Sequence, residues 1–290
     1  MSRAILPVPS LAGRRVLITG AARGIGAALA QRLHARGALV SVVGLEPDEL
    51  ASVAASCGDA PWARCDVSNL DDVNTAVAAM ASALGGLDVV VANAGIAAQF
   101  PLVDGDPAIL ERTLAVNVMG VYHSLRAAAP YVSHADGYAL AVSSLAAAVH
   151  LPLLGAYSAS KAAVEALGNT FRIELSPTGA RVGVAYFAEL DTDMTHRGFG
   201  TDAAKVLTGG GSLTRTTPLS VGIDALERGI ARRSRRIVAP WWVAAALPTR
   251  MMVQPAMDRF ARGRVADALR VARDEHPDFT TPQPERRASR

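Results

Sequence analysis

Two kinds of apolar segment alternate along most of the chain: short runs rich in valine, isoleucine and leucine, and longer stretches with helical spacing. This alternation predicts a parallel sheet, because parallel strands need a crossover that is usually a helix. We predict strands at 16–19, 39–43, 62–65, 88–92, 138–143, 182–187 and 236–239. We predict helices that include 27–36, 70–84, 108–131 (with a break near Val116), 157–175 and 219–232. The chain is therefore expected to form a single α/β domain, with a doubly wound parallel sheet between two layers of helices.

The first predicted strand leads through a glycine-rich turn into a helix. Glycine occupies positions 20, 24 and 26 of this turn. Gly20 permits a tight turn, while Gly24 and Gly26 let the backbone approach a pyrophosphate and let the helix pack closely on the strand. The helix N-terminus adds a partial positive charge. Because the spacing departs from G-x-G-x-x-G, the turn alone is only weak evidence for dinucleotide binding.

A tyrosine and a lysine stand four residues apart, at Tyr157 and Lys161. Only Lys161 and Lys205 are lysines among the 29 basic residues, so lysine at 161 indicates a task that arginine cannot perform. On a helix the two side chains share one face, where a nearby cation would lower the tyrosine pKa toward the range of an acid/base catalyst. Taken alone, such a pair is more often ordinary helix surface.

Together with these two features, three others in a fixed order make the chain resemble the short-chain dehydrogenase/reductase family. The five features are Thr19-Gly20-x-x-x-Gly24-Ile25-Gly26, Asn93-Ala94-Gly95, Asn117, Ser144 and Tyr157-x-x-x-Lys161. The resemblance covers about residues 11–240. It implies a Rossmann-type sheet with its ligand at the carboxyl ends of the strands. It also implies hydride transfer between a nicotinamide cofactor and a carbonyl or alcohol carbon.

The resemblance implies four catalytic residues. Tyr157 would give a proton to the substrate oxygen in reduction or take it in oxidation. Lys161 would lower the tyrosine pKa and bond the nicotinamide ribose. Ser144 would hold the substrate oxygen. Asn117 would kink its helix and hold a water that completes the proton relay.

The resemblance also implies the cofactor contacts. Asp66 and Val67 would face the adenine, the segment 93–95 would leave space for the cofactor, and Thr192 would contact the nicotinamide carboxamide. The complete expected set is Gly20, Arg23, Gly24, Ile25, Gly26, Gly44, Glu46, Asp66, Val67, Asn93, Ala94, Gly95, Tyr157, Lys161 and Thr192. One segment departs from the family, since Phe187-Ala188 replaces the usual Pro-Gly pair. We expect this change to alter the nicotinamide end or to narrow the substrate site.

The residues around the second strand leave the choice between NAD and NADP open. Gly44 replaces the acidic residue that usually bonds the ribose hydroxyls, so a 2′-phosphate is not excluded. Arg23 is a basic position associated with NADP in the family, but Leu45 stands where a second arginine would be expected. Glu46 and the acids at 48 and 49 place negative charge nearby, and Glu46 is a candidate ligand of the ribose. We favour NAD.

Residues 193–217 are rich in glycine, including Gly198, Gly200 and 209–211, which predicts a flexible substrate lid. The lid and the segments 151–154 and 187 offer apolar contacts: Met194, Phe199, Val206, Leu207, Leu151, Pro152, Leu153, Leu154 and Phe187. A lipophilic alcohol or ketone, such as a lipid, steroid or terpenoid, is therefore the expected substrate.

Two alternative functions remain. Arg23 and the missing acid at Gly44 would also suit an NADPH-dependent ketoacyl-type reductase. The altered pair 187–188 would suit a non-catalytic nucleotide-binding or scaffold protein, since a fold does not fix a function.

Charge is unevenly distributed along the chain. Residues 228–290 hold fourteen arginines and six acidic residues, a net charge of +8, which leaves −5 for residues 1–227 of the overall +3. The apolar run 237–253, broken by Pro240 and Pro248, is too short for a membrane-spanning helix of about 20 residues. Three interpretations remain: a helix packed at a subunit interface, which we favour, contact with an anionic membrane surface, or a cap over the active site. Nucleic acid is not indicated as a partner.

Four segments follow from these patterns. They are an N-terminal arm at 1–10, a Rossmann-type domain at 11–240, an apolar and basic helical extension at 241–276, with an amphipathic helix at 259–273, and a disordered polar tail at 277–290. The arm has no apolar run long enough for a signal peptide, so we expect a cytoplasmic protein, with peripheral membrane contact as the open alternative. Cys57 and Cys65 indicate neither a disulfide framework nor a metal site. By resemblance, a homodimer or homotetramer would form through the helices around Asn117 and Tyr157.

Overall fold

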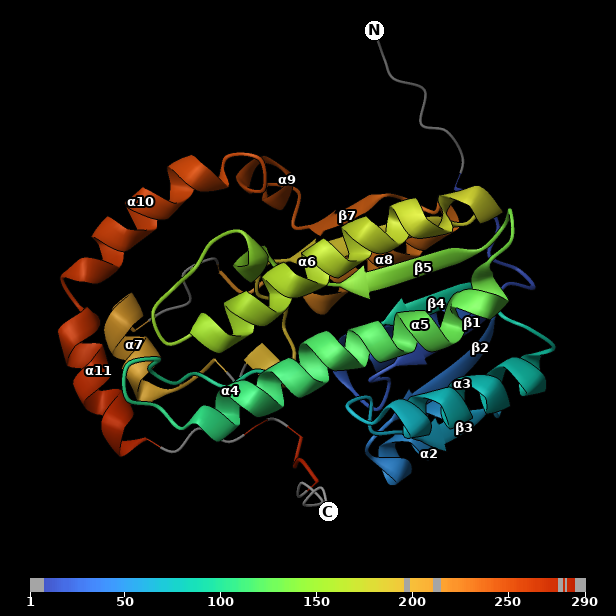
Figure 1. Cartoon of the computed structure of the whole chain (residues 1–290), viewed down its shortest axis with the longest axis horizontal. Helices are drawn as coiled ribbons and strands as arrows, with labels where there is room; N and C mark the ends of the chain where they lie inside the picture. Colours follow the sequence, from blue (N-terminus) through green and yellow to red (C-terminus); the bar gives the residue numbers. More distant parts are fainter. Residues whose placement is uncertain (1–7, 196–198, 211–214, 276–278, 280, 285–290) are drawn as a thin grey trace, which may run out of the picture.

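A seven-stranded parallel sheet forms the centre of the computed structural model, which describes residues 8–195, 199–210, 215–275, 279 and 281–284 (Figure 1). The strands are β1 Arg15–Thr19, β2 Leu39–Gly44, β3 Trp62–Arg64, β4 Val89–Ala92, β5 Tyr138–Val142, β6 Arg181–Phe187 and β7 Arg236–Ala239. Their order across the sheet is β3-β2-β1-β4-β5-β6-β7, and every neighbouring pair is parallel. The predicted doubly wound fold is confirmed, and each predicted strand end lies within one residue of the observed end.

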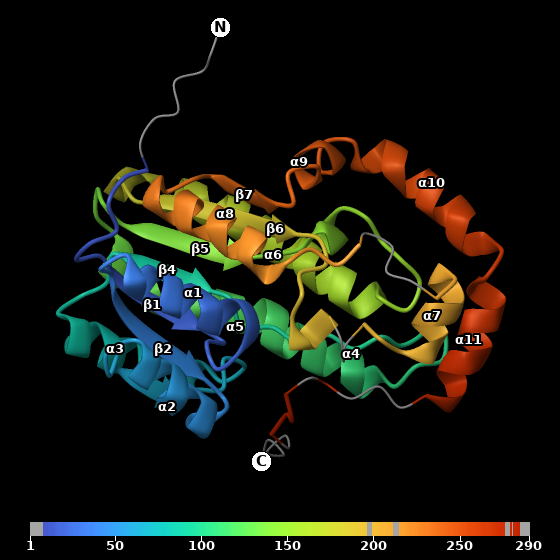
Figure 2. The ribbon, with the colours of Figure 1, turned by 180° about the vertical axis from the view of Figure 1, so that it is seen from behind.

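Helices cover both faces of the sheet, which gives the predicted three layers. The helices of one face are α1 Gly24–Ala35, α2 Pro47–Ser56 and α8 Leu219–Ala231, and those of the other are α3 Leu70–Leu84, α5 Gly120–Val132 and α6 Gly155–Leu175. Figures 1 and 2 show these layers from opposite sides. Successive residues of β1 point to opposite faces: Val16 and Ile18 pack in the cluster with α1 and α8, and Leu17 packs in the other cluster.

The chain connections diverge between β1 and β4, which are neighbours in the sheet. Such a point leaves a crevice at the carboxyl ends of the strands, where doubly wound folds bind their ligands. Thr19 joins the two strand ends there, because its hydroxyl accepts hydrogen bonds from the backbone N–H groups of Asn93 and Ala94, each at 3.1 Å. The sequence shows Thr19 next to the glycine-rich turn but does not indicate that its side chain bridges β1 and β4.

The predicted helix 108–131 is continuous but contains a wider turn. Its three parts are α4 Pro107–Leu114, the π-helical segment η1 Ala115–Met119 and α5. The predicted break near Val116 is thus a local π-helical turn rather than an interruption. Single π-turns inside α-helices often occur at functional sites, and Asn117 lies in this one.

The C-terminal extension forms an arch at the carboxyl end of the sheet (Figures 1 and 2). Its helices are α9 Val243–Ala246, α10 Arg250–Arg262 and α11 Val265–Asp274. The predicted basic helix 259–273 is therefore divided, and the division falls at Gly263, a residue of low helix propensity.

Helix α11 packs against α7 Asp202–Thr208 of the predicted lid through a small buried cluster that includes Ala203, Leu207, Ala268 and Ala272. The carboxylate of Glu275 accepts hydrogen bonds from the first two backbone N–H groups of α7, at 2.6 and 3.2 Å. A segment far away in the sequence thus holds the start of the lid helix.

Parts of the two chain ends and of the lid lie outside the described residues: 1–7 of the N-terminal arm, 196–198 and 211–214 of the lid (hence Gly198 and Gly211), and 276–278, 280 and 285–290 of the C-terminus. In the tail that we expect to be disordered, the described Phe279 packs against the second core cluster, and Gln283 accepts a hydrogen bond from Arg112 Nε at 3.0 Å. Among the described residues, no helix is long and apolar enough to cross a membrane.

Gly168 allows α6 to lie close to the sheet. A Cβ atom at this position would lie 2.6 Å from Val184 Cγ2, and Val184 is fully buried. We expect Gly168→Val to lower the free energy of unfolding by about 1–3 kcal/mol, measured by urea denaturation, because the packed core cannot give way. Gly263→Ala, where nothing lies within 4 Å of the added Cβ, is the matched control and should cost little. Equal effects of the two substitutions would contradict this account.

Candidate active site

A cavity of about 780 Å³ lies at the carboxyl ends of the strands, where the chain connections diverge. Nearly all of the predicted cofactor residues line it, together with Ser144, Tyr157 and Lys161. Two predicted residues, Gly26 and Asn117, lie behind its wall. The structure therefore brings the predicted set together but gives these two a supporting position.

The glycine-rich turn is shaped for close backbone approach. Gly20 and Gly24 have φ angles of +63° and +56°, a conformation that side chains other than glycine disfavour. A Cβ atom on Gly20 would lie 2.6 Å from the Cα of Ala94, and one on Gly26 would lie 2.3 Å from the carbonyl oxygen of Gly20. Gly26 thus serves packing inside the turn. The bare backbone that remains, at the start of α1, fits the pyrophosphate of a dinucleotide.

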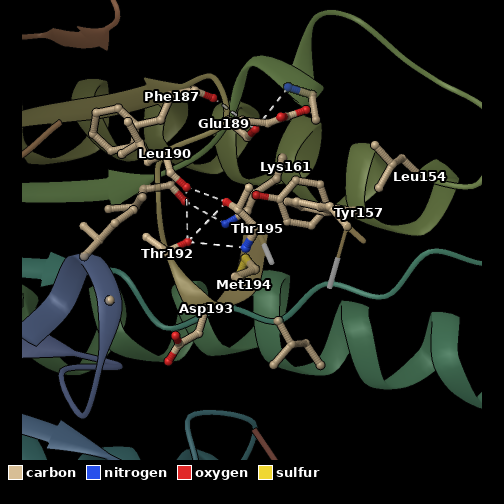
Figure 3. Close-up of a pocket in the computed structure, with 18 of the residues that line it drawn as sticks. Leu154, Tyr157, Lys161, Phe187, Glu189, Leu190, Thr192, Asp193, Met194 and Thr195 are labelled. Atoms are coloured by element: carbon tan, nitrogen blue, oxygen red, sulfur yellow. Dashed lines mark hydrogen bonds between the residues drawn. The ribbon is translucent and has the colours of Figure 1, made fainter. Parts of the chain in front are cut away.

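Tyr157 and Ser144 both line the cavity and share a hydrogen bond. Figure 3 shows Tyr157 and Lys161 in this cavity. Ser144 follows β5, where its hydroxyl donates to the carbonyl oxygen of Phe187 at 3.3 Å and accepts from the backbone N–H of Ala146 at 3.1 Å. Burial raises the pKa of Tyr157 to about 12, and a hydrogen bond with Ser144 lowers it only in part. Tyr157 is therefore protonated at neutral pH and is ready to act as an acid.

Lys161 lies one helical turn after Tyr157 and is buried as well. Its Nζ atom donates to the carbonyl oxygen of Val142 at 3.0 Å and lies 5.5 Å from the centroid of the Tyr157 ring. Burial lowers the lysine pKa to about 8. We expected the lysine to lower the tyrosine pKa, but in this structure the tyrosine pKa is raised, because burial of the phenol dominates.

Asn117 is completely buried in the π-helical segment. Its Oδ1 accepts from the backbone N–H of Ile96 at 2.8 Å, and its Nδ2 donates to the Ile96 carbonyl oxygen and to Ser160 Oγ, each at 2.9 Å. Ser160 Oγ in turn donates to the carbonyl oxygen of Tyr157 at 2.7 Å. Asn117 thus ties the loop after β4 to α6. Ser160 carries no sequence signal beyond its place between Tyr157 and Lys161.

The adenine end of the cavity carries two charged groups of residues. Arg23 forms an ion pair with Glu46 and also approaches Glu49 at 3.4 Å and Asp193 at 3.5 Å. One arginine thus faces three carboxylates.

The second group is centred on Asp66. Burial opposes ionisation of Asp66, but its pKa is lowered overall by hydrogen bonds from Ser68 and by the nearby charge of Arg112. Arg112 lies 3.3 Å from the Asp66 carboxylate. The sequence gives no signal for Arg112, because its partners come from distant parts of the chain.

The substrate end of the cavity is mainly apolar. Phe199 of the lid packs edge-on against Tyr157, with ring centroids 5.3 Å apart and planes at 72°. The other apolar side chains predicted to line it and found there are Leu151, Pro152, Leu154, Phe187, Met194 and Leu207, whereas Leu153 and Val206, also predicted to line it, pack in the cluster beneath α11. Four residues of the C-terminal extension also line the cavity: Trp242, Ala246, Val253 and Met257. The extension therefore caps the site, which is one of the three interpretations left open by the sequence.

Backbone hydrogen bonds join the two ends of the predicted lid to each other. The backbone N–H of Asp191 donates to the carbonyl oxygen of Thr217 at 2.9 Å, and that of Thr217 donates to the carbonyl oxygen of Glu189 at 2.8 Å. Thr192 follows this bridge, and its side chain lies 3.9 Å from the position of a Cβ on Gly24. Its place opposite the glycine-rich turn agrees with a contact to the cofactor.

Comparison with known proteins gives a consistent family. The family model described as short chain dehydrogenase matches residues 14–202. Glucose 1-dehydrogenase of Gluconobacter oxydans (strain 621H) is 37% identical over 187 residues, which cover 61% of this chain and 70% of that protein. Trans-4-hydroxycyclohexanecarboxylate dehydrogenase of Sinomonas cyclohexanicum is 34% identical over 203 residues, which cover 66% of this chain and 78% of that protein.

A solved structure agrees with these relatives. A short chain dehydrogenase from Burkholderia cenocepacia J2315, crystallised in complex with NADP, superposes with a TM-score of 0.71 at 29% identity and covers 79% of this chain and 97% of its own. The matched family model spans more than half of the chain, and Ser144, Tyr157 and Lys161 line one cavity with Gly20 and Gly24 of the glycine-rich turn. This protein therefore belongs to the short-chain dehydrogenase/reductase family and is an NAD(P)-dependent oxidoreductase that acts on CH–OH groups.

Proposed function

We propose that this protein interconverts a lipophilic secondary alcohol and its ketone, with NAD as the cofactor. The observation that carries the proposal is the apolar wall around Tyr157, to which the lid, the loop before α6 and the C-terminal extension all contribute. Such a wall binds a hydrocarbon skeleton by removing it from water, while Tyr157 and Ser144 supply the few polar contacts that orient the reacting oxygen.

The residues of the chain act on the substrate oxygen. When bound, the nicotinamide ring accepts or supplies the hydride. Ser144 and Tyr157 donate hydrogen bonds to the oxygen, and Tyr157, protonated at neutral pH, gives it a proton in reduction. In oxidation the phenol must first lose its proton, and the charged form of Lys161 stabilises the resulting phenolate. Gly20, Gly24 and Thr192 would hold the dinucleotide against β1 and β4.

The charges at the adenine end support NAD. Arg23 is already paired with Glu46 and lies near Glu49 and Asp193, so this corner carries more negative than positive charge. A 2′-phosphate would meet these carboxylates at close range, which is unfavourable in a partly buried site. The hydroxyls of a free ribose can instead donate hydrogen bonds to Glu46. A ketoacyl-type reductase that uses NADPH is the second candidate, and its support is Arg23 and the missing acid at Gly44.

The exposed faces of α5 and α6 support association into a homodimer or homotetramer. Met119 at the end of η1 and Tyr122 at the start of α5 are exposed, and Ile173 is 70% exposed near the end of α6. Apolar residues at such positions on two neighbouring helices suit an interface between copies.

A substrate series tests the proposal. Secondary alcohols of increasing chain length, together with alicyclic alcohols and glucose, would be assayed with NAD. We expect kcat/KM to rise about threefold or more per added methylene until the cavity is full, because each buried methylene adds about 0.8 kcal/mol. Preference for glucose over the apolar alcohols would overturn the substrate class and leave the family assignment intact.

Tyr157→Phe removes the proton donor and keeps the ring. We expect kcat to fall by about 10²- to 10⁴-fold, the usual contribution of a positioned acid or base. Affinity for NADH, measured by fluorescence titration, should change little. The control is Tyr131→Phe on the exposed end of α5, which should keep full activity. A Tyr157→Phe enzyme with near-normal kcat would rule out this role.

Lys161 should make stability depend on pH in a defined window. Its folded pKa of about 8 lies below the ordinary 10.5, so between these values the unfolded chain binds the extra proton and stability rises with pH. The slope is at most about 1.4 kcal/mol per pH unit. Above about pH 10 the raised pKa of Tyr157 acts in the opposite direction.

The measurement is urea unfolding of the wild type and Lys161→Met from pH 7 to 10. We expect the free energy of unfolding of the wild type, relative to the variant, to increase from about pH 8 to 10. Lys205→Met, at the only other lysine and on an exposed position, is the matched control and should give no such trend. A flat difference for Lys161→Met would mean that the buried lysine keeps an ordinary pKa.

Glu46→Gln should shift cofactor preference toward NADPH. The substitution removes the carboxylate that pairs with Arg23 and frees the guanidinium for a 2′-phosphate. We expect the ratio of the NADPH and NADH dissociation constants to fall at least tenfold. Glu174→Gln, on the exposed end of α6, should leave the ratio unchanged. A wild-type protein that already binds NADPH more tightly would overturn the NAD proposal and favour the reductase.

A further inference from the structure

The C-terminal arch has two apolar faces. Trp242, Val253 and Met257 line the cavity. On the outside of the same segment, Trp241 is 81% exposed, Met251 83% and Met252 78%. The other exposed residues between 241 and 256 are Ala244, Ala245, Pro248, Thr249, Arg250, Pro255 and Ala256. Two methionines and a tryptophan therefore lie in an outer surface that is almost wholly apolar, which is unusual unless something covers it.

Basic residues lie beside this outer surface on α10. This helix contains three arginines and one acidic residue, Asp258, whose carboxylate accepts a hydrogen bond from Gln254. Arg250 reaches back to Glu165 at 3.3 Å. Arg259 and Arg262 are exposed in the last turn of α10, and neither has a carboxylate partner among the described residues. The outer surface is thus an apolar patch with two exposed arginines, Arg259 and Arg262, at one end.

The exposed apolar residues and the neighbouring arginines together indicate which kind of partner binds this surface. A second copy related by a twofold axis would place Arg259 and Arg262 near the same two arginines of its partner, which is unfavourable. An anionic surface that accepts apolar side chains satisfies both properties. A helix with apolar residues on one side and arginines beside them lies in the plane of a bilayer interface, and tryptophan is favoured at that depth.

We propose that the outer face of α9–α10, formed by Trp241, Met251 and Met252 with Arg259 and Arg262 beside them, binds the surface of an anionic phospholipid bilayer. The outer face of this segment then contacts the bilayer, while its inner face lines the cavity. If the substrate is lipophilic, as proposed above, it reaches Tyr157 from the membrane past Val253 and Met257. The proposal of membrane binding does not depend on the substrate, because it is argued only from the exposed residues and their charge.

The test is sedimentation of the full-length protein with phosphatidylcholine vesicles, with and without phosphatidylglycerol. We expect binding to the vesicles that contain phosphatidylglycerol, weakened by added salt because surface charges are screened. The triple variant Trp241→Ser, Met251→Ser, Met252→Ser should lose at least tenfold in vesicle affinity. Arg259→Gln with Arg262→Gln should remove most of the preference for the anionic lipid.

Trp62→Ser is the matched control, because Trp62 is a partly exposed tryptophan on the edge strand β3. It should keep vesicle binding. NADH affinity should be the same in the wild type and in the triple variant, since none of the three residues lines the cavity, and this shows that the variant is folded.

Two results would overturn the proposal. One is that the wild-type protein binds neither kind of vesicle, and the other is that the wild type and the triple variant bind equally well. If the wild type does not bind and the triple variant also changes from dimer to monomer, the face belongs to an interface with a second copy. Each of these results is independent of turnover, so failure of docking and failure of the lipophilic-substrate proposal can be told apart.

Discussion

The close contact of α6 with the sheet positions the active site. Gly168 lets the helix approach Val184 of β6, and near the other end of the contact Ser143 Oγ donates to the Lys161 carbonyl oxygen at 2.8 Å. The Lys161 ammonium then reaches the last carbonyl of β5. One helix thus carries both catalytic side chains at a fixed depth below the cavity surface. Asn117 of η1 also holds this helix, because its side chain donates to Ser160 of α6, which in turn donates to the Tyr157 carbonyl oxygen. Chemistry at Tyr157 therefore depends on packing contacts that never touch a ligand.

Burial shifts the pKa values of Tyr157 and Lys161 in opposite directions. Burial favours the neutral form of each, so the phenol keeps its proton to higher pH and the ammonium loses its proton at lower pH. In the proposed mechanism, reduction can use the protonated phenol directly, whereas oxidation needs the positive charge of Lys161 to be present when the phenolate forms.

Sequence patterns predicted the elements well because the signals are local. The strands follow from runs of apolar residues, and Tyr157 and Lys161 follow from helical spacing, from the scarcity of lysine and from the resemblance to the family. Pairings across the fold had no such signal. The ion pair of Arg23 with Glu46, the bridge through Thr19 and the link from Asn117 to Ser160 each join segments at least 23 residues apart. The direction of the Tyr157 pKa was predicted wrongly for the same reason, because the sequence shows the neighbouring lysine but not how deeply the phenol is buried.

Adjacent residues of the C-terminal extension lie in different surroundings. Trp241 and Trp242 are adjacent, yet the first is exposed and the second lines the cavity. The same extension continues through α11, whose alanines pack on α7 and whose Glu275 holds the first turn of that helix. The arch therefore contacts the lid helix directly rather than through the sheet. Phe199, from the same predicted lid, packs on Tyr157. The C-terminal extension thus both lines the cavity and packs against the lid, so the lid of the Rossmann-type domain is supported by a segment outside that domain.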